Sequence, residues 1–276
     1  MQSNDQRSTV TRSEVCSLST VRRVAAMLNM EPDSMHEGLP LPRGWQFILL
    51  GADTPRKALR SDGFPGLGVP LPDLGLPRLM LAGRTVDYLA DIPVGATLRR
   101  NSWIEDIVEK EGASGPMALL TVGHRLELGD QPVLKETQTY ALLAADRERA
   151  SRRADVASPP SPGEVQRTIV PDETLLFQYS ALGFNSHKIH LNREYAQEVE
   201  GLPDLVVNGG LITLLMTEFV AHELAAVPRR LQTRHLAPLY CDRPLTMVAE
   251  RVGLAWRVSA LDDQGVLCAK MEVATQ

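Results

Sequence analysis

Alternating apolar and polar positions divide the chain into two runs of predicted strands. The first run comprises residues 85–90, 97–109, 117–127 and 133–143, separated by turns rich in glycine and proline. The second comprises residues 164–170, 231–236, 245–254, 255–261 and 266–273. A period of two between such turn residues is typical of antiparallel strands with one buried face. The pattern therefore predicts two antiparallel sheets.

Four further segments have helical patterns. Residues 14–28 form an amphipathic pattern, 171–182 carry a proline in the first turn, and 193–199 are short. Residues 205–226 are apolar on nearly every face, which is typical of a buried helix. Both halves thus place a helix before antiparallel strands, as a duplicated unit would. We expect an α+β fold in which each half wraps a curled sheet around a central helix.

A composition break separates the two halves. The stretch ASRRADVASPPSPG, residues 150–163, combines prolines, small residues and a basic cluster that cannot build a core. We interpret it as a linker between an N-terminal half, residues 1–149, and a C-terminal half, residues 164–276. Both halves have ordinary domain sizes.

Composition narrows the class of protein. With 43% hydrophobic and 23% charged residues, the chain is typical of soluble globular proteins. The net charge of -5 argues against a broad nucleic-acid grip, and three scattered cysteines favour a reducing compartment. No apolar run approaches the roughly 18 residues of a membrane span, and the polar N-terminus lacks a signal-peptide core. We expect a cytoplasmic protein with no nucleic-acid or membrane partner.

The densest polar cluster runs from Tyr179 to His190. Two of the six histidines in the chain, His187 and His190, lie three residues apart in a predicted loop after a helix. No cysteine or carboxylate stands at a ligand-like spacing beside them, which argues against a zinc site. A surface loop with incidental histidines is the alternative. The additional Tyr179 and Asn185 favour a functional site.

This cluster resembles the signature of the MaoC-like hydratases, which have the hotdog fold and act on coenzyme A thioesters. Their pattern Gly-Asp-x-Asn-Pro-x-His places its histidine on His190 and its aspartate on Asn185, with His187 and Lys188 at the asparagine and proline positions. The form Phe-Asn-x-His-x-Ile-His resembles the branch of mesaconyl-C4-CoA and itaconyl-CoA hydratases and mitochondrial type 2 hydroxyacyl-thioester dehydratases.

The similarity extends from about Leu39 to the C-terminus. The segment LVVNGGLI, residues 205–212, is similar to the family's LVVHGPL, with Asn208 in place of the histidine. The segment PRLMLAGR, residues 77–84, resembles the branch's PRRMWAGG, with departures at Leu81 and Arg84. The resemblance implies a double hotdog whose C-terminal half keeps the catalytic loop and whose N-terminal half shapes the acyl pocket.

Adding water across a double bond beside a thioester requires a base, a proton for carbon and stabilisation of negative charge on the thioester oxygen. Histidine suits the first two tasks near neutral pH. We expect His190 to act as base and acid, with His187 as second choice, and the Asn185 amide to hold the water. Tyr179 and His187 are expected to contact the substrate.

The oxyanion hole is predicted at Asn208, Gly209 and Gly210, where the buried helix begins. Asparagine favours the N-cap, the first helical N–H groups have no partners within the helix, and the helix dipole attracts negative charge. Glycines let a substrate oxygen approach closely, and Asn208 would also contact the substrate. The alternative is that both glycines only allow close packing against a strand.

The resemblance implies hydration of a branched, carboxylated enoyl-CoA, itaconyl-CoA or mesaconyl-C4-CoA, to citramalyl-CoA, a step of itaconate degradation. Arg84 or Arg78 would bind the substrate carboxylate, unless Arg84 points to solvent at a strand start. Candidates for the phosphates of coenzyme A are Arg234, Arg230 and Arg60. The alternatives are a 3-hydroxyacyl-thioester dehydratase for unbranched chains and a non-catalytic acyl-CoA-binding protein. We expect no metal and no cofactor, because coenzyme A is part of the substrate, and we leave a homodimer open.

Overall fold

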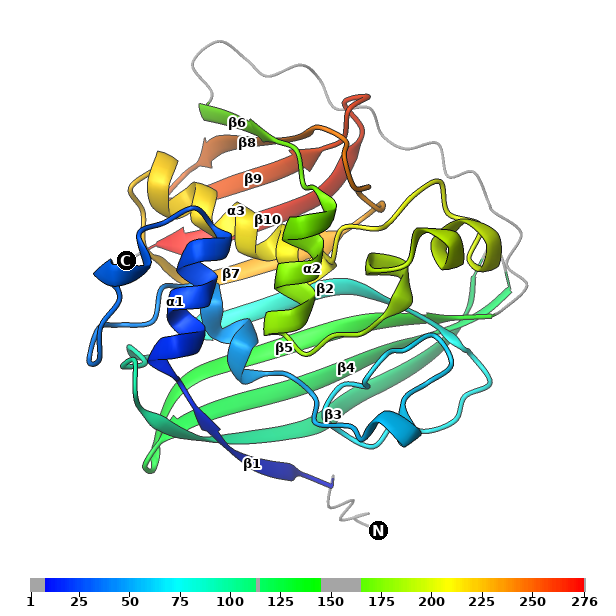
Figure 1. Cartoon of the computed structure of the whole chain (residues 1–276), viewed down its shortest axis with the longest axis horizontal. Coiled ribbons are helices and arrows are strands. Elements are labelled where there is room, and N and C mark those ends of the chain that lie inside the picture. The colour runs from blue at the N-terminus through cyan, green and yellow to red at the C-terminus, as the bar shows by residue number, and fades with distance from the viewer. Residues whose placement is uncertain (1–7, 113–114, 145–164, 276) are drawn as a thin grey trace.

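The strands join into one continuous antiparallel sheet (Figure 1). The computed structural model describes residues 8–112, 115–144 and 165–275, so the predicted linker at residues 150–163 lies outside the described residues. The first five strands are β1 (Val10–Val15), β2 (Arg78–Tyr88), β3 (Thr97–Gly112), β4 (Gly115–Leu128) and β5 (Gln131–Leu143). The other five are β6 (Val165–Ile169), β7 (Pro228–His235), β8 (Leu245–Val252), β9 (Ala255–Leu261) and β10 (Leu267–Thr275).

The strand order repeats between the halves. The sheet runs β1-β3-β4-β5-β2 through the first half and continues β7-β10-β9-β8-β6 through the second. The two units meet where β2 pairs with β7, from Gly83 opposite Arg234 to Asp87 opposite Arg230. Each unit therefore presents the same strand of its own order to the other, as the predicted duplication requires.

Three α-helices lie on one side of this sheet (Figure 1). The helices α1 (Leu18–Met27) and α2 (Glu173–Leu182) contact each other, and α3 (Gly209–Glu223) packs against β7 and β10. Ten consecutive residues of α3, from Leu211 to Val220, are buried, as its mostly apolar sequence predicts, and they include the polar Thr213, Thr217 and Glu218. Shorter helical turns are η1 (Pro32–Ser34), η2 (Trp45–Leu49), η3 (Arg56–Ala58), η4 (Lys188–His190) and the π-helical η5 (Tyr195–Val199).

Several predicted boundaries are wrong, for local reasons. The predicted helix 14–28 begins only at Leu18, because the alternating residues before it form the edge strand β1 against β3. The predicted helix 205–226 begins at Gly209, since the Val207 N–H donates instead to Leu239 O at 2.8 Å. The predicted strand 85–90 starts earlier, at Arg78, because its first residues pair with β5. The other predicted strands agree with the structure to within three residues.

The core has two parts. The larger cluster surrounds α3 and contains buried side chains from both halves. A smaller cluster lies on β2, β4 and β5 and is closed by Phe64, Leu67 and Val69, which belong to an irregular segment. Part of the first-half sheet is therefore covered by a loop. None of the helices within the described ranges has the length and apolar character that a membrane span needs.

Candidate active site

The loop after α2 turns both histidines inward. Asn185 N donates to Ser180 O at 2.8 Å, and Asn185 Oδ1 accepts from His187 N at 3.0 Å. This asparagine turn leads into η4, which ends at His190. His187 and His190 are each 8% exposed, whereas Phe184 just before them is 63% exposed. The alternative that these histidines lie on a surface loop is therefore wrong, while their role stays a prediction.

His190 is held as a neutral imidazole. Its Nδ1 lies 2.7 Å from Val206 O, and since a carbonyl can only accept, Nδ1 carries the proton and donates. The Nε2 lone pair is then the basic position of the ring. Burial lowers the pKa of His190 to about 3, and the neighbouring His187 adds to the fall. At neutral pH the ring is therefore neutral, with Nε2 unprotonated.

His187 lies between His190 and the first half of the chain. Its ring is perpendicular to that of His190, with centroids 5.4 Å apart, and meets Phe64 edge-on at 5.6 Å. Its Nε2 lies 3.7 Å from Asp62 Oδ2. Burial lowers the pKa of His187, while Asp62 and Glu200 oppose the fall. The sequence analysis did not identify Phe64 or Asp62 as parts of this site.

The start of α3 is tied directly to this loop. Val206 N donates to Ile189 O at 3.0 Å, next to the bond from His190 to Val206. Within α3, Ile212 N donates to Asn208 O at 3.0 Å, so the N–H groups of Gly209 and Gly210 precede the first intrahelical bond. The segment that leads into the predicted oxyanion donors is thus hydrogen-bonded to the predicted base at Val206.

Asn208 occupies the N-cap position, but its side chain does not cap the helix as expected. Its Nδ2 donates to Ser180 Oγ at 3.2 Å, and its Oδ1 is buried without a hydrogen-bond partner. The side chain is turned toward α2 rather than over the first turn of α3. The helical N–H groups consequently stay open to another acceptor, and a polar atom inside the site is left for a donor.

The two glycines at the start of α3 have different neighbours. A Cβ on Gly210 would collide with the Tyr179 hydroxyl, whereas one on Gly209 would meet the Leu81 side chain of β2 at 3.2 Å. The alternative of close packing against a strand therefore applies at Gly209. At Gly210 the missing Cβ makes room for a phenol. The Tyr179 ring stacks on Phe47, with centroids 4.6 Å apart, and burial raises the pKa of Tyr179 to about 12, so its hydroxyl remains a donor.

Arg84 also reaches the start of α3. It is 8% exposed, so the alternative that it points to solvent is wrong. Its Nη2 lies 3.5 Å from the position of a Cβ on Gly210. Its Nε lies 3.1 Å from Glu136 Oε1, an ion pair without hydrogen-bond geometry. A cation is therefore present at the predicted acyl site, and a buried carboxylate already balances it.

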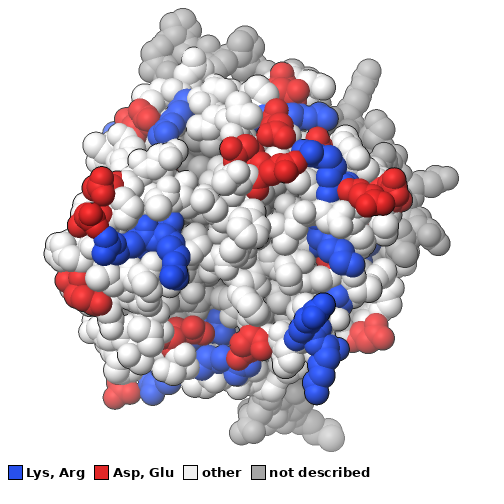
Figure 2. Space-filling view, in the orientation of Figure 1, with Lys and Arg blue, Asp and Glu red and all other residues white. Residues whose placement is uncertain are grey.

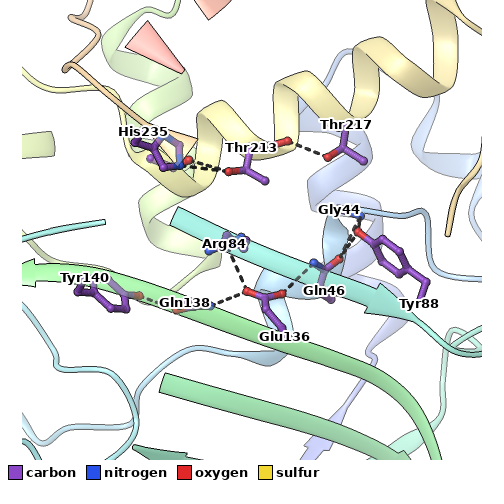
Figure 3. A network of polar contacts seen from close by, with 11 residues as sticks. Gly44, Gln46, Arg84, Tyr88, Glu136, Gln138, Tyr140, Thr213, Thr217 and His235 are labelled. Carbon is purple, nitrogen blue, oxygen red and sulfur yellow. Dashed lines mark hydrogen bonds and ion pairs between the residues drawn. The ribbon is translucent and has the colours of Figure 1, made fainter. Parts of the chain in front are cut away.

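Glu136 is the centre of a buried polar network in the first half (Figure 3). Its Oε2 accepts from Gln46 Nε2 at 3.0 Å and its Oε1 from Gln138 Nε2 at 2.6 Å, while Tyr140 donates to Gln138. Three polar residues on the buried face of the strand, Glu136, Gln138 and Tyr140, are the sequence signal that could have revealed this network.

The other predicted arginines are divided between the surroundings of the histidine loop and the exposed face of β7. Arg78 forms an ion pair with Glu200 at 2.8 Å. Arg230 pairs with Asp87 at 2.8 Å, and Arg230 and Arg234 lie on the exposed face of β7. Arg60 pairs with Asp62 beside the loop. On the face seen in Figure 2, basic and acidic side chains are interspersed.

The surroundings of the loop include a surface groove but, among the residues that the structure describes, no metal-binding cluster. Within the described residues, no group of three or more histidine, cysteine, aspartate or glutamate side chains could hold a metal ion. A surface groove lies directly before the loop and is lined by Arg12, Arg56, Arg100 and Phe184, among others. Arg12 and Arg100 form ion pairs there with Asp53 and Glu14.

Known proteins share both the sequence and the architecture. Residues 44–241 match the family described as hydroxyacyl-thioester dehydratase type 2. The chain is 34% identical over 232 residues to the mesaconyl-C(4)-CoA hydratase of Chloroflexus aurantiacus, covering 83% of this chain and 82% of the relative. It is 35% identical over 89 residues to the mitochondrial hydroxyacyl-thioester dehydratase type 2 of Schizosaccharomyces pombe, covering 31% and 30% of the two chains.

Solved structures show the fold. A MaoC-like dehydratase from Phytophthora capsici superposes with a TM-score of 0.71 at 14% identity, covering 98% of this chain and 96% of that one. A Mycobacterium tuberculosis protein with a double hotdog fold gives a TM-score of 0.57 at 15% identity, covering 99% and 97%. The predicted α+β double hotdog is confirmed, and the chain belongs to the type 2 hydroxyacyl-thioester dehydratase family.

Proposed function

We propose that the protein is a hydro-lyase that hydrates itaconyl-CoA or mesaconyl-C4-CoA to citramalyl-CoA. One observation carries the proposal: the buried His190 is held neutral by a bond from Nδ1 to Val206 O, in the segment that leads directly to the open N–H groups beginning α3. The Chloroflexus relative, named for mesaconyl-C(4)-CoA hydration, supports the same reaction class.

The proposed reaction uses His190 and the start of α3 in turn. His190 Nε2 takes a proton from water as the water oxygen bonds to the β carbon, and the electron pair of the double bond moves to the thioester oxygen. The N–H groups of Gly209 and Gly210 stabilise the resulting enolate oxygen. The His190 imidazolium then returns its proton to the α carbon, so that one water has been added. For itaconyl-CoA, removal of an α proton first forms an enolate at the same oxygen, and return of a proton to the terminal methylene carbon moves the double bond into conjugation as that carbon becomes a methyl group.

The main role of Asn185 is to hold the conformation of the loop through a turn. Its Oδ1 already accepts a hydrogen bond from His187 N. A water that donates to this oxygen would therefore be its second donor. The turn it makes fixes where His187 and His190 enter the site. Its amide N–H₂ group is the remaining donor for the water.

Arg84 is the proposed partner of the substrate carboxylate, because it is buried and its guanidinium reaches the start of α3. Glu136 favours the second candidate function, since it already balances the charge of Arg84. A site with no surplus charge suits an uncharged acyl chain, and therefore a 3-hydroxyacyl-thioester dehydratase acting on unbranched substrates. A non-catalytic acyl-CoA-binding protein is the third candidate, because Asn185 stands where the family pattern has aspartate.

A turnover assay separates these functions. The purified protein is given mesaconyl-C4-CoA, itaconyl-CoA, crotonyl-CoA and 3-hydroxybutyryl-CoA in turn, and loss or gain of the conjugated thioester is followed by absorbance. We expect the highest kcat/KM on one of the two carboxylated substrates. Faster conversion of the crotonyl and 3-hydroxybutyryl pair would favour the dehydratase. Binding of all four thioesters without turnover would establish the non-catalytic alternative.

A further inference from the structure

A short segment of the first half, residues 61–63, is hydrogen-bonded to the loop that carries the histidines. Lys188 donates through its backbone N–H to Asp62 O at 2.9 Å and through Nζ to Ser61 O at 2.7 Å. Ser186 Oγ donates to Gly63 O at 2.6 Å. Gly63 has a φ of +78°, and a Cβ there would collide with Ser186 O. The two backbones are thus fixed against each other at a distance only glycine allows.

Asp62 presents a buried carboxylate at this junction. It is 8% exposed, and burying a carboxylate is costly unless hydrogen bonds and a counter-charge compensate. Its Oδ1 accepts from Phe64 N at 2.9 Å, and its Oδ2 accepts from Arg60 Nε at 3.2 Å. These two partners orient the carboxylate so that Oδ2 faces His187 Nε2 at 3.7 Å.

The ring of His187 connects this carboxylate to His190. Its charged or titratable neighbours are Asp62, Glu200, Arg60 and His190. A carboxylate oxygen opposite Nε2 favours the tautomer with the proton on Nε2, and it resists rotation of the ring. The 3.7 Å separation is longer than a hydrogen bond, and such contacts commonly tighten when substrate binds.

We infer that Asp62 is a positioning residue, supplied by the first half, that holds His187 in the orientation and Nε2–H tautomer needed beside His190. This inference rests on the proposed function, since it assigns the two histidines to one hydration site. Asp62 acts through His187 and does not itself contact the reacting atoms. The first half would then contribute directly to the geometry of the catalytic loop.

The first test is nuclear magnetic resonance of protein with ¹⁵N-labelled histidine, which reports tautomer and pKa without substrate. Asp62→Asn keeps an acceptor for Phe64 N but removes the charge, and Asp73→Asn makes the same change at an exposed residue of the first half. We expect Asp62→Asn to lower the pKa of His187 by about one unit and to weaken the Nε2–H preference. Asp73→Asn should leave both unchanged.

Arg60→Gln provides a test of opposite sign. It retains the carboxylate but withdraws the cation that opposes protonation of His187, so the pKa of His187 should rise. This variant also covers the case in which Asp62→Asn does not fold. An unchanged His187 tautomer and pKa in folded Asp62→Asn, or no rise in Arg60→Gln if Asp62→Asn fails to fold, would overturn the inference.

Kinetics complete the test. We expect Asp62→Asn to lower kcat about tenfold, as misplaced catalytic groups do, with KM changed less than about threefold. In a His187→Gln background the same substitution should have little further effect, because its target is gone. Independent, multiplying losses would contradict action through His187. Absence of turnover in the wild type would defeat the proposed function and leave the magnetic-resonance result to decide the role of Asp62.

Discussion

The two halves share a strand order but bury different chemistry against the sheet. In the second half, α3 covers the sheet with ten consecutive buried residues, and its Thr217 hydroxyl bonds only to the helix's own backbone, at Thr213 O. In the described part of the first half, three short turns, η1 to η3, occupy the place in the chain that α3 has in the second. The buried face there carries Arg84 and Glu136.

This difference shows how one duplicated sheet can serve two tasks. A long apolar helix fixes its own N-terminus, so its open N–H groups can stabilise charge at a defined place. A network of buried polar groups contributes little net stability, because desolvation offsets its interactions, but each member fixes the others. In the proposed mechanism, the second half supplies proton transfer and charge stabilisation, and the first half lines and supports the site.

The largest expected effect comes from the contrast between His190 and His124, the buried histidine of the first half. His190→Ala should lower kcat by about 10²–10⁴-fold while the circular dichroism spectrum stays that of the wild type. His124→Ala should retain most activity and lose stability, since its Nδ1 is bonded to Ser102 Oγ at 2.9 Å in the core. Steady-state kinetics and thermal melts of both variants make the comparison. A folded His190→Ala enzyme retaining more than about a third of wild-type kcat would place the base elsewhere.

The next effect concerns the loop itself. Asn185→Ala removes the acceptor for His187 N and should cost about 10²-fold in kcat by misplacing both histidines. Asn185→Asp keeps that acceptor but adds a charge, so it should weaken binding of carboxylated substrates more than that of crotonyl-CoA. Kinetics of both variants on both substrates across pH test this. Full activity of Asn185→Ala would show that the loop holds its shape without the turn.

The buried ion pair of Arg84 and Glu136 in the first half can be tested by replacing one partner or both. Arg84→Met leaves Glu136 buried without its counter-charge and should cost about 3–5 kcal/mol of unfolding free energy. Arg84→Met combined with Glu136→Gln should recover much of that loss, because the uncharged amide keeps one acceptor oxygen for the Gln46 and Gln138 donors. If Arg84 binds the substrate carboxylate, the double variant should lose far more kcat/KM on mesaconyl-C4-CoA than on crotonyl-CoA. Equal losses on the two substrates would argue against a carboxylate clamp.

Low pH should destabilise the protein, because both halves contain buried histidines whose pKa values are lowered by folding. Burial lowers the pKa of His190 to about 3 and those of His124 and His235 to about 4, against about 6.5 in the unfolded chain. Below pH 6.5 the unfolded state therefore binds protons that the folded state does not. As the pH is lowered from about 6.5 to about 4, the unfolding free energy decreases. Urea unfolding at pH 7 and pH 5 measures the change. His124→Gln should reduce the difference in unfolding free energy between the two pH values by the contribution of one histidine. Equal stability of the wild type at both pH values would be inconsistent with neutral buried rings.

Local patterns predicted much of the fold and the loop, but not the contacts between distant segments. The strands and α3 follow from periodicity, and the Asn185–His190 loop follows from residue type. The strand β1 was missed because its polar alternation continues into an amphipathic helix. Asp62 could not be found, since only folding brings it to His187. The assignment of Arg230 and Arg234 to the phosphates of coenzyme A stays a prediction, since residue type does not show on which face of β7 they lie.

A crystal structure with an unreactive thioester, such as butyryl-CoA, tests the division of labour between the halves most directly. The account predicts that the thioester oxygen lies about 3 Å from the N–H groups of Gly209 or Gly210. The α and β carbons should then face His190 Nε2, with the acyl chain against Arg84 and Tyr179. A thioester oxygen held away from the start of α3, or an acyl chain seated entirely within the first half and out of reach of His190, would contradict it.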